Sequence, residues 1–224
     1  MDNSKVGMTE TTVSNYEKLC EYWREQFLNM DHQELAAKLP ELIWRDEDLV
    51  LTYFGKRYSI NRENGLIQGL DEVEQPVSWG FQMILYNLLW FSKEGAMLSN
   101  QWVPFRSVKN AGPFAPAFSA HVLKPFSETF SGQVEKLHQA AQKLGGQPLP
   151  QGDAGYQINA FECIPIQFLF WDGDDEFPAQ GNILFDYSVT DFIHVESTVT
   201  IAADGIARLA EVAGIPLLGD SYGS

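Results

Sequence analysis

The sequence predicts a single α+β domain, in which helices cover a mainly antiparallel sheet. Short segments with alternating apolar and polar residues are separated by turn signals, and a strongly apolar helical segment stands among them. The chain has 224 residues, the length of one domain, and its composition is 45% hydrophobic and 13% aromatic, which is enough for a buried core. We find no internal repeat, low-complexity segment or linker, so one domain is expected.

The N-terminal part predicts two helices behind a polar end. Residues 1–11 are polar and are expected to be flexible, residues 12–218 form the domain, and residues 219–224 form a C-terminal tail. An apolar stripe predicts a helix over residues 13–30. Asp31 is placed to cap a second helix, which runs to Leu39.

The next segments predict a hairpin and a central helix. Residues 49–54 and 57–60 alternate with period two around a Gly-Lys turn, and residues 66–67 follow an Asn-Gly turn as a third strand. Residues 77–92 are apolar on nearly all sides, with Pro76 suited to the first turn, so this helix is expected in the core.

The second half of the chain predicts a long ordered loop, three helices, two strands and a final helix. The loop covers residues 101–118 and includes a short strand around residues 103–107. Pro165 and Cys163 indicate a bulge or kink between two strands, in place of a hairpin turn. Ser188 and Asp191 resemble a capping box ahead of the final helix. The expected helices are residues 117–124, 125–130, 133–144 and 192–213, and the strands are residues 156–161 and 164–171.

Charge and cysteine content limit the possible partners. Thirty acidic and 15 basic residues give a net charge of −15, which repels nucleic acids and anionic lipids. Cys20 and Cys163 are too few for a cysteine-rich zinc or iron–sulfur site, and free thiols fit a reducing compartment. No secretion signal and no apolar run long enough to span a membrane is apparent. We therefore expect a cytoplasmic protein.

Acidic residues follow the strand at residues 164–171 and recur after the next strand. If the two strand ends and the following element came together, these groups could hold a hard divalent cation such as magnesium, manganese or iron. A solvated acidic turn, in which aspartates bond their own backbone, is the alternative. The metal-ligand candidates are Asp172, Asp174, Glu176, Asp186, Asp191 and His194.

Two further features bear on ligand binding. On a helix, Asp191 and His194 would share a face, so that the carboxylate could orient the imidazole, although an exposed histidine also fits the pattern. Arg106 lies in an aromatic loop of a chain that is poor in basic residues. We expect it either to form an ion pair with an acidic residue of the protein or to bind the anionic group of a ligand. We take Arg106, Trp102 and Trp171 as ligand-binding candidates.

Three stretches carry a family resemblance. The run FWDGDDEFPAQGNILFDYSVTDFIHVES, with ILYNLLWFSKEGAMLSNQWVPFRSVKNAGPFAPAF upstream and LGGQPLPQGDAGYQINAFECIPIQFLFW between them, resembles the bacterial and archaeal family catalogued as domain of unknown function 3786. The resemblance covers about residues 49–209, and the W-x-G-D-x-E-F-P block is its most specific motif. It implies an anaerobic setting. Some relatives carry an added iron–sulfur domain with four clustered cysteines, similar to modules that serve corrinoid and electron-transfer proteins, and this chain lacks that cluster.

These observations lead to one functional expectation and two alternatives. We expect a non-catalytic binding or accessory module of anaerobic metabolism, with a corrinoid or iron–sulfur protein as its partner. The first alternative is a divalent-metal-dependent hydrolase or lyase that uses the acids near His194, with Asp191 or Glu196 as general base. The second is a purely structural role for the acidic block.

Overall fold

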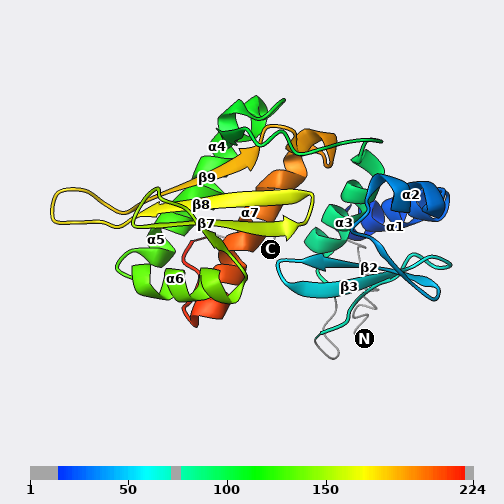
Figure 1. The fold of residues 1–224 in the computed structure, drawn as a ribbon, viewed down its shortest axis with the longest axis horizontal. Helices are drawn as coiled ribbons and strands as arrows, with labels where there is room; N and C mark the ends of the chain where they lie inside the picture. The colour runs from blue at the N-terminus through cyan, green and yellow to red at the C-terminus, as the bar shows by residue number, and fades with distance from the viewer. Residues whose placement is uncertain (1–14, 72–76, 220–224) are drawn as a thin grey trace, which may run out of the picture.

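The computed structural model describes residues 15–71 and 77–219, which form two antiparallel sheets and the helices around them (Figure 1). The α+β class and the single domain are confirmed, with the strands divided between two sheets instead of one. The expected flexible residues 1–11, Pro76, and residues 220–224 of the expected tail lie outside the described residues.

The smaller sheet has the strand order β1-β2-β3-β4. The predicted hairpin is confirmed, but its turn lies one residue earlier than the predicted Gly-Lys pair: the β2–β3 register ends at Tyr53 and Lys56. The turn residues Phe54 and Gly55 both have positive φ, at 43° and 78°. This conformation matches the twist of the flanking strands. The strands are β1 Ile43–Arg45, β2 Asp48–Tyr53, β3 Lys56–Asn61 and β4 Ile67–Gly69.

The larger sheet has the strand order β5-β9-β8-β7-β6. The predicted kink between the two long strands is wrong, because β7 and β8 form an antiparallel hairpin in which Phe161 pairs with Ile164 across a two-residue turn. The irregularity lies inside β7, where the register shifts between Asn159 and Phe161. The strands are β5 Trp102–Pro104, β6 Gln147–Pro148, β7 Ala154–Phe161, β8 Ile164–Trp171 and β9 Gln180–Asp186.

The helices largely follow the predicted periodicity. Asp31 caps α2 by accepting hydrogen bonds from the backbone N–H groups of Gln33 and Glu34. Within α3, seven residues are buried, but Trp79 and Trp90 are exposed, so this helix is central without being enclosed on all sides. The α-helices outside the segment around Pro125 are α1 Asn15–Leu28, α2 His32–Lys38, α3 Trp79–Phe91, α6 Val134–Lys143 and α7 Val195–Ala213.

The two helices predicted on either side of Pro125 form one uninterrupted helical run. Its parts are α4 Ala115–Phe118, the π-helical turn η3 Ser119–Leu123 and α5 Lys124–Phe130. Proline has no backbone N–H and breaks a regular α-helix, but a wider π turn immediately before Pro125 lets the chain remain helical. Short 3₁₀ turns occur at η1 Phe105–Ser107, η2 Gly112–Phe114 and η4 Val189–Asp191.

One continuous core joins the two sheets. The Phe54 N–H donates to the Ala160 carbonyl at 2.9 Å, and the Tyr53 and Phe161 rings are 4.8 Å apart, so the β2–β3 turn is bound to β7. Helix α7 runs behind the larger sheet (Figure 1). Of the helices in the described ranges, none is long and apolar enough to cross a membrane.

Candidate functional site

The acidic residues are divided between the two ends of β9. The acids from Asp172 to Glu176 precede this strand, and Asp186 is its last residue. Seven residues of strand span about 20 Å, which separates Asp186 from the other acids. Throughout residues 15–71 and 77–219, no three His, Cys, Asp or Glu side chains are grouped where they could hold one metal ion. The expected meeting of the two strand ends is therefore wrong, because the two groups of acids lie at opposite ends of the same extended strand.

Backbone donors hold the acids between β8 and β9. Asp174 Oδ1 accepts from the N–H groups of Phe177 at 2.7 Å and Glu176 at 2.8 Å, and these bonds lower the pKa of Asp174. Asp172 Oδ1 accepts from Gly132 N–H at 2.8 Å and from Gly173 N–H at 2.9 Å. The interpretation of this block as an acidic turn whose aspartates bond the backbone is confirmed.

This loop also presents aromatic surface. We call residues 171–179 the hairpin tip, which projects beyond the helices at one end of the larger sheet (Figure 1). Phe177 is 63% exposed and Trp171 is 40% exposed, on a segment that carries four acids. Trp171, Phe177 and Pro178 line an open depression of about 530 Å³, together with Asp172 and residues 180–182.

Asp186 is buried in a network of protein donors. Its Oδ1 accepts from the N–H and hydroxyl groups of Ser188 at 2.9 and 2.6 Å and from those of Ser99 at 2.9 and 2.7 Å, and its Oδ2 accepts from Asn100 N–H at 2.6 Å. Burial raises the pKa of Asp186, but the hydrogen bonds from Ser188 and Ser99 outweigh that effect, so the pKa is lowered. The network ties the loop before β5 to the end of β9.

Asp191 and His194 do not share a helix face. Helix α7 begins at Val195, after the 3₁₀ turn that contains Asp191, so the predicted capping box is wrong. Ser188 instead donates its hydroxyl to Asp186. The cap of α7 is His194, whose Nδ1 accepts from Glu196 N–H at 3.3 Å, whereas Asp191 pairs with Lys93 at 2.5 Å.

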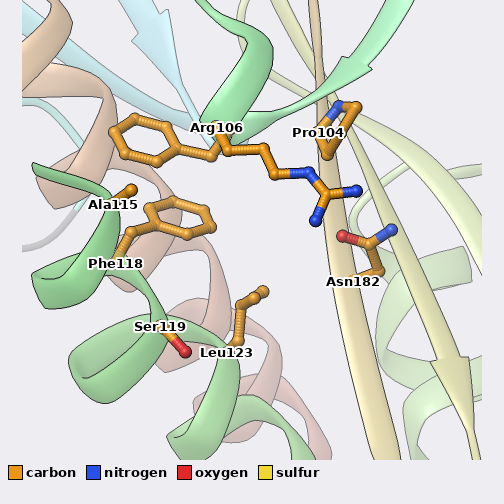
Figure 2. Close-up of a pocket in the computed structure, with 8 residues that line it drawn as sticks. Pro104, Arg106, Ala115, Phe118, Ser119, Leu123 and Asn182 are labelled. Atoms are coloured by element: carbon orange, nitrogen blue, oxygen red, sulfur yellow. The ribbon is translucent and has the colours of Figure 1, made fainter. Parts of the chain in front are cut away.

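The three ligand-binding candidates lie at different places on the larger sheet. Trp102 pairs with Asp186 at one end of β9, and Trp171 pairs with Gln180 at the other. Arg106 is in η1, immediately after β5, and lines a cavity of about 360 Å³ beside β9. Figure 2 shows its guanidinium extended over this cavity toward Asn182, with Phe118 and Leu123 on the helical side. Among the described residues Arg106 has no ion-pair partner, so the expected internal pair is absent.

The sequence does not predict that a half-buried carboxyl group on α7 bonds to the β2–β3 hairpin. Asp204 accepts a 2.7 Å hydrogen bond from the Tyr53 hydroxyl, and burial raises the pKa of Asp204 to about 6. Helical spacing alone predicts that Asp204 lies on the polar side of this helix, with Arg208 and Glu211. The small residues around Asp204, including Gly205, were the available signal, since they let the β2–β3 turn approach the helix.

Comparison with known proteins identifies a family. No curated protein and no solved structure matches the chain. The model of the family described as Domain of unknown function (DUF3786) matches residues 31–208 of the 224 residues. The matched range includes both sheets, the hairpin tip and the Arg106 cavity. The chain therefore belongs to the DUF3786 family.

Proposed function

We propose that this protein is a non-catalytic binding module of anaerobic metabolism, which docks through its hairpin tip on a corrinoid or iron–sulfur protein. One observation carries the proposal: Phe177 and Trp171 are exposed on a projecting loop that is rich in acids. Large aromatic side chains that are exposed together with charged neighbours are typical of protein-binding surfaces.

The electrostatics of the hairpin tip favour a basic partner surface. None of its four acids forms an ion pair with any residue of the described ranges. The negative charge of these acids therefore remains available to an approaching protein, in a chain whose net charge is already −15. Such a surface accelerates association with a positively charged patch, and the aromatic rings then supply apolar contact area.

The choice of partner class rests on family resemblance and on cysteine content. Relatives with an appended four-cysteine domain hold an iron–sulfur cluster within their own chain, as the resemblance implies. This chain has only Cys20 and Cys163, one in α1 and one in the β7–β8 turn. Two cysteines that lie in separate elements cannot form a four-cysteine site, so we assign the metal centre to a partner protein.

The state of the acids favours binding over catalysis. Asp186 is saturated by protein donors and Asp191 is paired with Lys93, so neither presents a free carboxylate to a substrate. A general base needs its lone pair within reach of the substrate proton. Of the candidate acids, Glu196 in the first turn of α7 and those of the projecting tip remain accessible, and the tip is where a protein surface can contact several of them at once (Figure 1).

Biolayer interferometry with a purified corrinoid protein and a purified ferredoxin tests the proposal. We expect binding to at least one of them, weakened roughly tenfold by Phe177→Ser, because an exposed ring at an interface centre is a typical hot spot. Met97→Ser is the matched control, since Met97 is 79% exposed on the loop after α3. Glu176→Gln is expected to slow association at low salt and to have less effect at high salt. The proposal fails if neither partner binds, or if Phe177→Ser and Met97→Ser behave alike.

A further inference from the structure

The cavity beside β9 has a local charge opposite to that of the whole protein. The chain has twice as many acidic as basic residues, yet no acid lines this cavity and one of its walls is Arg106. Arg106 is exposed and has neither an ion pair nor a hydrogen bond to other residues of the described ranges. Its planar guanidinium therefore retains all its donors, in a fork that matches a carboxylate.

Below the guanidinium the cavity is apolar. Phe118, Leu123 and Ala115 contribute its helical side, and Phe105 stacks on Phe118 with 4.2 Å between the ring centroids. A dry apolar cavity of about 150 Å³ accommodates benzene. The volume of about 360 Å³ therefore has room for one aromatic ring or a short aliphatic chain together with a carboxylate.

The strand wall of the cavity is closed to another strand. β5 covers only residues 184–186 of β9, which leaves the first half of this edge without a neighbouring strand. Two of its N–H groups are already bonded to side chains: that of Gly181 donates to Ser127 Oγ at 2.8 Å, and that of Ile183 donates to Asn182 Oδ1 at 3.0 Å. An added peptide strand needs such groups free. The wall therefore favours a compact small molecule over an extended peptide.

From these features we propose that the Arg106 cavity binds a small monocarboxylate with a compact apolar body, such as an arylalkanoate or a short fatty acid. The guanidinium of Arg106 takes the carboxylate as a bidentate partner. Phe118 and Leu123 cover the apolar part, and Ser119 lines the end of the cavity away from the guanidinium (Figure 2). Ser119 and Leu123 are the first and last residues of the π-helical turn, which places both of them on the cavity wall. Such turns are frequent at functional sites.

Titration of the full chain with 3-phenylpropionate, followed by amide NMR shifts and by calorimetry, tests this site. We expect saturable binding with shifts centred on Ser119, Leu123 and Asn182. Arg106→Met is expected to weaken binding roughly tenfold or more, because a charge-assisted bidentate contact is lost. Arg45→Met is the matched control, since it removes one exposed cation from β1, far along the chain from the cavity. Ser119→Phe, which fills the cavity and keeps Arg106, is expected to abolish binding.

The neutral analogue 3-phenylpropanol separates carboxylate recognition from apolar binding, and it is expected to bind roughly tenfold more weakly than the acid. Equal affinity for acid and alcohol, or affinity of Arg106→Met within about twofold of wild type, overturns the proposal. Absence of saturable binding for both 3-phenylpropionate and octanoate also overturns it. The Phe177→Ser variant is expected to bind the carboxylate normally, so failure of this site and failure of partner docking are distinguishable.

Discussion

Replacing Asp186 with asparagine is the most direct test of the buried network at the end of β9. The carboxylate is 1% exposed and accepts five hydrogen bonds, three of them from backbone N–H groups. An asparagine can keep its oxygen at the Oδ1 position, where four of these donors converge. Its NH₂ group then replaces Oδ2 and faces the N–H of Asn100, so that a donor meets a donor.

The expected loss follows from that geometry. One buried donor left unsatisfied costs about 1–3 kcal/mol, and the four remaining bonds lose their charge assistance. We therefore expect Asp186→Asn to lower the free energy of unfolding by roughly 2–4 kcal/mol at neutral pH. The matched control is Asp191→Asn, the same chemical change five positions later, at a carboxylate that is 42% exposed and paired with Lys93. That surface pair is worth less than about 1 kcal/mol.

Urea denaturation at several pH values measures both variants. The folded-state pKa of Asp186 is depressed, so its contribution is present above the unfolded pKa and is lost as the pH falls through the folded pKa. The Asp186→Asn variant is therefore expected to lose stability less steeply in acid than the wild type. Equal unfolding free energies for Asp186→Asn and Asp191→Asn would refute the view that this network holds the loop before β5.

Three further predictions concern the core and the thiols. Gly205→Ala is expected to destabilise the protein by about 1–3 kcal/mol by overpacking, since the new Cβ would lie 2.6 Å from a ring carbon of Phe168. The control is Gly80→Ala in α3, whose Cβ would meet its nearest neighbour at 3.8 Å and which is expected to raise the melting temperature. The pKa of Asp204 is raised to about 6, so its protonated form stabilises the fold below the unfolded pKa, and this contribution is lost as the pH rises through 6. Asp204→Asn is therefore expected to flatten the dependence of the unfolding free energy on pH between pH 4 and 7. Burial and Glu41 raise the pKa of Cys163, so a thiol reagent at pH 8 is expected to modify it slowly, and faster in Glu41→Gln; equal rates would contradict this assignment.

Elements with local signals could be predicted from the sequence. The β2–β3 hairpin combines period-two alternation with a glycine turn, and α6 ends at two glycines, so both appear where the sequence places them. The cap of α2 needs only Asp31 and the next three residues. Such features depend on interactions within a few positions, which composition and spacing encode directly.

The arrangement of the candidate site depends on contacts that spacing does not encode. The acids near Asp174 and Asp186 are close in sequence, but the direction of β9 between them separates their side chains. Asp204 is half-buried against Tyr53, 151 positions away, although helical spacing alone places it on the polar side of α7. The predicted start of α7 is wrong for a related reason. Ser188 cannot cap this helix, because its hydroxyl donates to Asp186.

The network around Asp186 also determines where Arg106 lies. The loop that donates N–H groups to Asp186 leads directly into β5, whose register on β9 fixes the point at which the chain turns into η1. Asp186, which the sequence suggested as a metal ligand, thus affects the cavity by positioning Arg106. Asp186→Asn, which changes no residue that lines the cavity, is therefore expected to weaken 3-phenylpropionate binding in calorimetry by displacing Arg106. Asp191→Asn is expected to leave the affinity unchanged. Unaltered affinity in a folded but destabilised Asp186→Asn variant would show that β5 holds Arg106 without this network.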